Sequence, residues 1–273
     1  MSTWLITGCS TGLGRALAEA VLAAGHDAVV TARDESKVAD LAGEHVLTAA
    51  LDVTVPEQVT DVVRRAEERF GGIDVLVNNA GYGYRAAVEE GDDADVRALF
   101  DANFLGAVAM VKAVLPGMRA RRSGAIVNIS SIGAQVKPVG SGYYAAAKLA
   151  LEGMTGSLRG ELAPLGISVT AVEPGGFRTD FAGRSLTQAR TPIADYAETA
   201  GKRRKEVDTA HGTQPGDPAR AATAIISAVE SAEPPAMLLL GTDALTSYRE
   251  VLRAQLAEAD AWAELTTSTD FDA

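Results

Sequence analysis

The regular alternation of short apolar runs with longer amphipathic stretches constrains the fold of this chain more than any other feature, and it extends from residue 4 to about residue 264. The apolar runs lack a polar residue at every second position, which is typical of strands buried on both faces. Parallel strands need long crossovers, and helices usually supply them. The pattern therefore predicts an α/β fold: a doubly wound parallel sheet with helices on both faces.

Seven strands and six helices can be delimited in the sequence. The expected strands are residues 4–7, 28–32, 46–51, 74–78, 125–129, 168–172 and 236–240. The expected helices are residues 12–24, 35–41, 56–70, 92–119, 142–162 and 243–264. Pro56 in the first turn of one helix, and Gly71 after its last, are typical of helix boundaries.

The composition favours one domain that spans residues 1–273. With 47% hydrophobic residues, a chain of this length can bury a large core without disulfides or metals. Cys9 is the single cysteine and the three histidines are scattered, so we expect no disulfide and no metal site. The first residues do not resemble a signal peptide, and no apolar run approaches the roughly 20 residues of a membrane span. We therefore expect a cytoplasmic protein with no membrane partner.

Acidic residues outnumber basic ones, and the formal net charge is −11. A nucleic-acid partner requires a basic face, so none is expected. The run Lys202-Arg203-Arg204-Lys205 is the exception. It fits either a solvated helix face or a docking site for the anionic tail of a substrate.

Residues 180–216 interrupt the alternation with many Gly, Thr, Pro, Asp and basic residues and with no strand pattern. An insertion of this length before the next core helix is more often functional than idle, so we interpret it as a lid over a substrate. Its apolar members, together with the preceding Phe177, indicate a hydrophobic substrate or simple core packing. They are Phe181, Leu186, Ile193 and Tyr196.

Glycines at positions 8, 12 and 14 lie where the first expected strand passes into the first expected helix. Such glycines allow a tight turn and a close approach of the backbone to a pyrophosphate. The helix N-terminus adds amide donors and a partial positive charge. The spacing differs from the commonest dinucleotide fingerprint, yet its position between strand and helix predicts a nucleotide site.

Tyr144 and Lys148 lie four residues apart in an expected helix, with Ser131 thirteen residues before the tyrosine. Residues at this spacing share one helix face. A nearby ammonium would lower the pKa of a tyrosine from about 10, and such a tyrosine can exchange protons with an alcohol or a carbonyl. A serine hydroxyl could hold the substrate oxygen. Alone, this spacing carries little information, because it arises by chance in many chains.

Taken together, the motifs resemble those of the short-chain dehydrogenases/reductases, in the branch with subunits of about this length. The similarity is close over residues 3–180 and looser to about 241. In chain order the motifs are Thr7-Gly8-x3-Gly12-x-Gly14, Asp52-Val53, Asn78-Asn79-Ala80-Gly81, Asn103, Ser131, Tyr144-x3-Lys148 and Pro174-Gly175-x3-Thr179. The tract from Glu173 to Phe181 is similar to the subgroup of 17β-hydroxysteroid and retinol dehydrogenases. The resemblance implies a Rossmann-type sheet in the order 3-2-1-4-5-6-7.

The resemblance also implies a nicotinamide cofactor and the residues that hold it. Asp52 would bind the adenine amino group beside the backbone of Val53, residues 78–81 would pack against the ribose, and Thr179 would hold the carboxamide. The cofactor-binding residues are expected to be Gly8, Ser10, Thr11, Gly12, Leu13, Gly14, Arg33, Asp52, Val53, Asn79, Ala80, Gly81, Tyr144, Lys148, Pro174, Gly175, Phe177 and Thr179. Without the resemblance, Asp52 could be a helix cap and residues 78–81 a strand-ending turn.

Four residues receive catalytic roles from the resemblance. Tyr144 would be the general acid/base, and Ser131 would hold the substrate oxygen. Lys148 would bind the nicotinamide ribose and lower the tyrosine pKa, and Asn103 would pass a water to the lysine. The implied enzyme is an NAD(P)-dependent oxidoreductase that interconverts a ketone or aldehyde with an alcohol. The alternatives are a non-catalytic NAD(P)-binding regulator on the same fold, and a different reaction such as epimerisation or dehydration in the same site.

Three choices depend on neighbouring residues. Arg33 at the end of the second strand favours NADP(H) over NAD(H), unless Asp34 reaches the ribose instead of capping the next helix. Ser130 and Ser131 point to opposite faces, and the family pattern selects Ser131. Tyr143 has Ala147 rather than a lysine four residues later, which selects Tyr144. The expected partner molecules are a small carbonyl or alcohol substrate and further copies of this chain, in a dimer or tetramer that pairs through residues 92–118 and 142–162.

Overall fold

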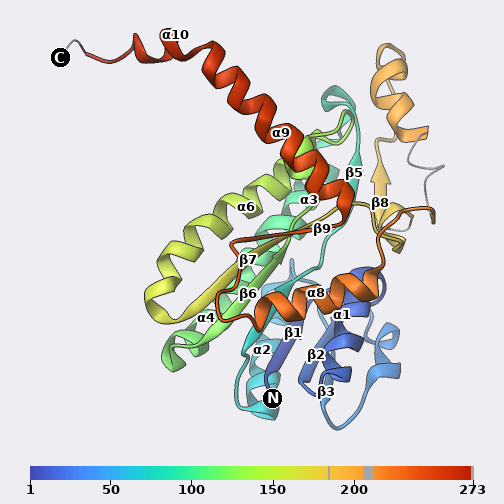
Figure 1. The fold of residues 1–273 in the computed structure, drawn as a ribbon. Helices are drawn as coiled ribbons and strands as arrows, with labels where there is room; N and C mark the ends of the chain where they lie inside the picture. The colour runs from blue at the N-terminus through green and yellow to red at the C-terminus, as the bar shows by residue number, and fades with distance from the viewer. Residues whose placement is uncertain (184, 206–211, 272–273) are drawn as a thin grey trace.

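The computed structural model describes residues 1–183, 185–205 and 212–271, and its centre is a parallel sheet of seven strands (Figure 1). From one edge to the other the strands are β3 (Val46–Ala50), β2 (Asp27–Ala32), β1 (Thr3–Ile6), β4 (Val75–Asn78), β6 (Gly124–Ile129), β7 (Ile167–Pro174) and β9 (Met237–Leu240). Each neighbouring pair is parallel. Because β5 and β8 lie outside this sheet, the predicted order 3-2-1-4-5-6-7 is confirmed.

Helices cover both faces of the sheet (Figure 1). One face carries α1 (Gly12–Ala23) and α8 (Pro218–Val229). The other carries α2 (Pro56–Phe70), α4 (Gly106–Arg121) and α6 (Gly142–Leu162). The bounds expected for α2 and α6 agree with those observed.

Consecutive residues of β1 explain why the apolar runs are unbroken. Trp4 and Ile6 belong to the core under α1 and α8, whereas Leu5 belongs to the core under α2, α4 and α6. All three side chains are fully buried. Burial of one such side chain contributes roughly 1.5–3 kcal/mol. The central strands are therefore fixed by packing on both faces.

The long helix expected over residues 92–119 is interrupted by a π-helical turn. Asp92 caps α3 (Asp93–Phe100), the turn η4 (Asp101–Leu105) follows, and α4 continues the helix. Taken as one helix of 29 residues, Asp93–Arg121 is apolar and long enough to cross a membrane by length and composition. In this fold the α4 part packs against the sheet, with Met110 and Met118 fully buried.

The helix expected over residues 35–41 is wrong. Two short 3-10 helices stand there, η1 (Glu35–Lys37) and η2 (Ala39–Leu41). The carboxylate of Asp34 accepts the N–H and the hydroxyl of Ser36, at 3.0 Å and 2.7 Å. This local bonding draws the backbone into a tight turn that competes with an α-helix.

A second, two-stranded sheet corrects the reading of residues 180–216 as free of strands. β5 (Gly83–Arg85) pairs in parallel with β8 (Leu186–Gln188). Strands of three residues are too short for a recognisable pattern, and here the partners lie about a hundred residues apart in the chain. A short helix that was not expected, α5 (Ile132–Val136), begins directly after Ser131.

The C-terminal segment projects from the body of the protein. α9 (Thr242–Ala261) leaves the sheet at one corner and is followed by α10 (Ala263–Thr267), with a break at Trp262 within the helix expected over 243–264 (Figure 1). Along α9 only Ala244 is buried. Packing therefore fixes the base of this helix alone.

Candidate active site

The strand order reverses between β1 and β4, and the loops after these two strands contain much of the expected cofactor site. Ligands of doubly wound sheets bind beyond the carboxyl ends of the strands at such a point. The Thr7 hydroxyl accepts the backbone N–H groups of Asn79 and Ala80, both at 3.0 Å. The side-chain amide of Asn79 donates to the carbonyl oxygens of Thr7 and Gly8, at 2.8 Å and 3.0 Å. These bonds hold the glycine loop against the end of β4.

Two glycines of this loop are required by close packing. Gly8 has φ +74°, and a Cβ atom there would lie 2.9 Å from Cα of Ala80. A Cβ atom at Gly14 would overlap the amide of Asn79 and lie 2.5 Å from the carbonyl oxygen of Gly8. Glycine alone adopts positive φ without strain and leaves room for these contacts. The loop and α1 can therefore lie directly against Asn79 and Ala80.

The N-terminus of α1 has no side-chain cap. Thr11 occupies the N-cap position without a capping hydrogen bond, and no acidic residue stands in the first turn. By contrast, Asp92 caps α3 and Asp217 caps α8. The uncapped end leaves backbone N–H donors and a partial positive charge, which suit a phosphate group. Ser10 is exposed beside this turn, and Leu13 is half-buried.

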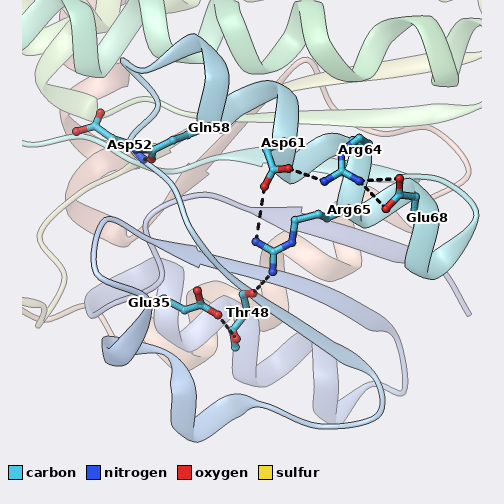
Figure 2. Close-up of polar contacts among 8 residues, drawn as sticks. All are labelled: Glu35, Thr48, Asp52, Gln58, Asp61, Arg64, Arg65 and Glu68. Carbon is cyan, nitrogen blue, oxygen red and sulfur yellow. Dashed lines mark hydrogen bonds and ion pairs between the residues drawn. The ribbon is translucent and has the colours of Figure 1, made fainter.

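Asp52 and Val53 follow β3, which lies on the other side of β1 from β4. The Asp52 carboxylate accepts the N–H and the hydroxyl of Thr54, at 2.9 Å and 2.6 Å. Its backbone N–H donates to Oε1 of Gln58 at 2.7 Å, and Figure 2 shows the carboxylate directed away from Gln58. Burial raises the pKa of Asp52, but the bonds from Thr54 and the charge of Arg33 outweigh it and lower that pKa. The N-cap of α2 is residue 55, so Asp52 is not its cap.

Arg33 is exposed at the end of β2, where its charge acts on Asp52 and on Tyr82. Asp34 caps η1, as expected. The guanidinium of Arg33 thus acts on Asp52, which is expected to bind the adenine, while the carboxylate of Asp34 accepts hydrogen bonds within its own turn.

The four residues with expected catalytic roles gather around Gly81. A Cβ atom at Gly81 would lie 2.5 Å from Oδ1 of Asn103 and 3.5 Å from Nζ of Lys148. The Lys148 ammonium lies 5.9 Å from the ring centroid of Tyr144. A Cβ atom at Gly133 would lie 3.2 Å from Oγ of Ser131 and 3.8 Å from Cε1 of Tyr144, so the serine hydroxyl lies beside the tyrosine ring. The structure therefore brings Asn103, Ser131, Tyr144 and Lys148 to one place.

Asn103 and Lys148 are both almost fully buried, at 1% and 4% exposure. Lys148 donates to the carbonyl oxygen of Ile129 at 2.8 Å. The amide of Asn103 donates to the carbonyl oxygens of Tyr82 and Leu99, at 3.1 Å and 3.0 Å, whereas its Oδ1 is buried and has no partner among the residues that the structure describes. A buried acceptor without a partner costs about 1–3 kcal/mol. Oδ1 is therefore suited to accept a hydrogen bond from a water molecule.

The tyrosine pKa differs in direction from the expectation. Burial raises the pKa of Tyr144 to about 12, and the hydrogen bond with Ser131 offsets only part of this. Burial also lowers the pKa of Lys148 to about 8, against the opposing charge of Glu152. The i,i+4 spacing does bring the lysine near the ring, but its ammonium donates to the main chain. In the structure as it stands, Tyr144 therefore remains protonated at neutral pH.

The neighbouring serine and tyrosine are engaged elsewhere. The hydroxyl of Ser130 donates to Glu152, on the opposite side from Ser131. The hydroxyl of Tyr143 donates to the carbonyl oxygen of Val88 at 2.6 Å. Asn78 also turns into the sheet, where its amide donates to Asn128 at 2.8 Å. Of the tract 78–81, only Asn79, Ala80 and Gly81 adjoin the glycine loop or the tyrosine site.

The end of β7 completes the site. The N–H of Gly175, directly after Pro174, donates to the carbonyl oxygen of Leu240 at 2.9 Å. The next N–H, of Gly176, donates to the carboxylate of Asp243 at 2.7 Å. Sequence reasoning missed Asp243, because its only signal is a carboxylate in the first turn of the last helix.

Residues 177–181 connect this turn to the glycine loop and to Tyr144. A Cβ atom at Gly12 would lie 3.3 Å from Cβ of Thr179, so the two expected cofactor contacts are adjacent. Phe177 forms an isolated parallel β-bridge with Gly216. The ring of Phe181 lies 5.7 Å from that of Tyr144 and is 40% exposed.

Residues 193–204, within the span predicted to be a lid, are attached to the body by Glu90, another residue that sequence reasoning missed. Its carboxylate accepts N–H bonds from Ala87 at 2.8 Å and Ile193 at 2.9 Å. The guanidinium of Arg204 donates to both of its oxygens, at 2.8 Å and 3.1 Å. Arg204 belongs to the basic run 202–205, and its side chain is only 11% exposed. This member of the run is therefore bound by the protein itself and is not a free docking cation.

Comparison with known proteins decides the family. Residues 2–190 match the family model of the short chain dehydrogenases. This chain belongs to the short-chain dehydrogenase family. It is 38% identical over 270 residues to "Oxidoreductase BOA17" of Botryotinia fuckeliana, covering 97% of this chain and 98% of that protein. It is 40% identical over 199 residues to "Retinol dehydrogenase 8" of Homo sapiens, covering 68% of this chain and 62% of that protein.

Solved structures with the same fold include those of two short-chain dehydrogenases. One from Streptomyces avermitilis superposes with a TM-score of 0.92 at 39% identity, covering 99% of this chain and all of that one. ElxO with NADP bound gives 0.74 at 27% identity, covering 90% and 100%. A short-chain dehydrogenase/reductase of Burkholderia phymatum in complex with NAD gives 0.80 at 25% identity, covering 93% and 95%. The enzyme class is thus a short-chain dehydrogenase/reductase acting on CH–OH groups, and its cofactor is a nicotinamide dinucleotide.

A cluster of polar residues lies beneath the lysine of this dehydrogenase and was not expected. Glu152 accepts from Ser130 and, at 2.6 Å, from Gln135, which also approaches Glu173 at 3.3 Å. Glu152 follows Lys148 by four residues in α6, a spacing that could have indicated it. Glu173 comes from β7 and has no comparable local signal.

Proposed function

We propose that this short-chain dehydrogenase interconverts a ketone or aldehyde with an alcohol, using NADP(H), with Tyr144 as the general acid/base. The observation that carries the proposal is the convergence of Asn103, Tyr144 and Lys148 around Gly81, with the hydroxyl of Ser131 beside the tyrosine. A tyrosine, a serine and an ammonium at one buried place provide a proton donor, an oxygen anchor and a positive charge.

The residues present fit a dinucleotide. The uncapped N-terminus of α1 suits the pyrophosphate, and the backbone from residue 8 to residue 14 would hold it. Asp52 and Val53 would bind the adenine, and residues 79–81 would contact the ribose beside Tyr144 and Lys148. Residues 174–179 would hold the nicotinamide through Pro174, Gly175, Phe177 and Thr179. When bound, the nicotinamide supplies or accepts the hydride.

The protein residues would manage the proton. In the reducing direction, Tyr144 gives its phenolic proton to the oxygen that develops negative charge, and Ser131 donates a hydrogen bond to that oxygen. A pKa of about 12 keeps Tyr144 protonated at neutral pH, which suits a general acid. The buried Oδ1 of Asn103 would hold a water within reach of Lys148, from which the tyrosine regains its proton.

The preference for NADP(H) follows from charge at the end of β2. Arg33 is free to meet a 2′-phosphate, whereas the carboxylate of Asp34 is engaged by Ser36. We expect NADPH to bind more tightly than NADH and Arg33→Asp to reverse the order in a fluorescence titration. Tighter binding of NADH to the unmodified enzyme would refute this preference.

The substrate side of Tyr144 is apolar. The ring of Phe181 packs against the tyrosine and leaves 40% of its surface open. Leu186, in β8, is partly buried next to it and approaches the same region of β5. These contacts support a hydrophobic alcohol or carbonyl substrate, with residues 180–216 acting as its lid; residues 184 and 206–211 of this span lie outside the described residues. We further propose a homo-oligomer that pairs through α4 and α6, and a cytoplasmic location.

The test is a panel of ketones, aldehydes and alcohols followed by NADPH absorbance. Tyr144→Phe should lower kcat by at least about a hundredfold, since general acid catalysis contributes about 10²–10⁴-fold. Tyr143→Phe removes a neighbouring hydroxyl that is bound to Val88 and serves as the matched control. Loss of activity in the control and not in Tyr144→Phe would refute the assignment. Tight NADPH binding without turnover of any substrate would instead indicate a regulatory protein.

A further inference from the structure

Two carboxyl groups lie side by side beneath Lys148, and the reaction as proposed uses neither of them. Glu173 in β7 is fully buried, and Glu152 in α6 is partly buried. One nitrogen atom, the amide Nε2 of Gln135, lies 2.6 Å from Oε2 of Glu152 and 3.3 Å from Oε1 of Glu173, so the two carboxyl groups are close to each other. Two adjacent buried carboxylates repel each other, and burial disfavours both charges. A pair of this kind is stable when it carries one proton.

The hydrogen-bond donors around the pair favour a charge on Glu152. Glu152 accepts from the hydroxyl of Ser130 and, at 2.6 Å, from the amide of Gln135. Glu173 accepts only one long bond among the described residues, from Gln135 at 3.3 Å, and its Oε2 is buried without a partner. A proton on Oε2 would turn this unpaired acceptor into a donor. The hydrogen-bond donors therefore stabilise the ionised form of Glu152, and the proton is on Glu173.

The charge of Glu152 acts on the buried ammonium of Lys148. Among the described contacts, the ammonium donates to a neutral carbonyl, that of Ile129, and the carboxylate that acts on it is Glu152, one helical turn away. An isolated buried ammonium tends to lose its proton. The charged groups that face Glu152 are Lys148 in α6, Lys137 after α5 and Glu173 in β7.

We propose that Glu152 and Glu173 hold one proton between them and that the remaining negative charge, on Glu152, keeps Lys148 protonated. Both are positioning residues that act through Lys148, and their effect on turnover rests on the proposed function. The directions of the pKa shifts agree: burial raises the pKa of Glu173 to about 7, with the charge of Glu152 adding to it, and burial also raises that of Glu152. Below about pH 7 the three groups then have no net charge.

The shared proton can be observed without activity. At about pH 6 ordinary carboxyl groups are ionised, so an infrared band of a protonated carboxyl group identifies a shifted one. We expect this band in the unmodified protein and expect its loss in Glu173→Gln. Its absence from the unmodified protein, or its persistence in that variant, would overturn the shared proton even if every substrate were turned over.

The effect on Lys148 is read from the pH profile of kcat. Glu152→Gln removes the negative charge, so the alkaline limb should move down by roughly one pH unit, from the Coulomb interaction of charges one helical turn apart. Glu173→Gln mimics the protonated acid and should leave that limb in place. Ser130→Ala removes a hydrogen bond that stabilises the negative charge of Glu152, so the alkaline limb should move in the same direction but by less. This variant provides the test if Glu152→Gln does not fold.

The outcomes separate the two proposals. An unmoved limb in Glu152→Gln, or equal shifts in both glutamine variants, would overturn the positioning role, because a purely structural defect lowers activity without this pattern. A protein that turns over no carbonyl substrate would refute the proposed function. The infrared band would still decide whether the two carboxyl groups share a proton.

Discussion

Glu90→Gln removes the charge at the centre of the contact that holds residues 193–204 against the body of the protein. The carboxylate of Glu90 is fully buried, and it accepts bonds from Arg204, Ile193 and Ala87. The Arg204 side-chain hydrogen bonds, opposed by burial, lower the pKa of Glu90 from 4.5 to about 2. This fall corresponds to about 3 kcal/mol, and breaking a buried ion pair by removal of one partner costs about 3–5 kcal/mol.

Because residues 193–204 lie at the surface, we expect the loss to appear first as local opening. Hydrogen exchange should show about a hundredfold faster exchange of the protected amides in residues 193–204, since about 1.4 kcal/mol is a factor of ten. Since the native pKa lies below the unfolded one, this contribution is complete above about pH 5 and is lost as the pH falls towards 2. Acidification of the unmodified protein should therefore release the same segment.

Glu89→Gln provides the matched control. Glu89 is exposed and accepts one bond, from the hydroxyl of Tyr196 at 2.7 Å. Loss of the Glu89 charge should change the rate of hydrogen exchange in residues 193–204 by less than about fivefold, because exposed polar pairs contribute little to stability. Equal effects of the two variants, or unchanged exchange in Glu90→Gln, would refute the role of Glu90 as the attachment point.

Three further outcomes are expected. Gly14→Ala places a methyl group against the amide of Asn79 and should lower the free energy of unfolding in urea by about 1–3 kcal/mol. The same variant should bind NADPH more weakly, and an unaffected affinity would contradict the packing role. Asp243→Ala removes the acceptor of the N–H of Gly176 and should raise the Kd for NADPH several-fold with little change in kcat, and an unchanged Kd would argue against it. Lys148→Met should abolish turnover and should remove the rise in unfolding free energy that the unmodified protein shows above about pH 8, because burial lowers the pKa of this lysine to about 8; a variant that keeps this rise would count against the buried-charge cost.

Local pattern was sufficient for most of the sheet and for the glycine loop. Residues 56–70 have strong apolar periodicity and clear ends, and the structure begins and ends the helix there; the bounds expected for residues 142–162 are also those observed. The unbroken apolar runs predicted helices on both faces of a parallel sheet, whereas the strand order was expected from the resemblance to the short-chain dehydrogenases/reductases. The prediction of an α-helix over residues 35–41 was wrong for a local reason, because the hydrogen bonds of Asp34 with Ser36 outweigh a weak helical pattern.

Contacts between distant segments could not be predicted. Glu90 and Arg204 are 114 residues apart, and each looks like an ordinary surface charge in the sequence. The same holds for Glu173 in a buried strand. The tyrosine pKa shows a different limit: spacing brought Lys148 near Tyr144, but only the structure reveals that the ammonium turns to Ile129.

The π-helical turn at Asp101–Leu105 has a consequence for how this helix can change. One extra residue in a turn rotates everything after it by about 100°, because an α-helix has 3.6 residues per turn. The bulge lets α3 and α4 present unrelated faces to their neighbours while Asn103 points to the buried site. Deleting one residue here would restore a regular helix but would turn Met110 and Met118 out of the core or Asn103 out of the site. The number of residues in this turn is therefore as constrained as their identity.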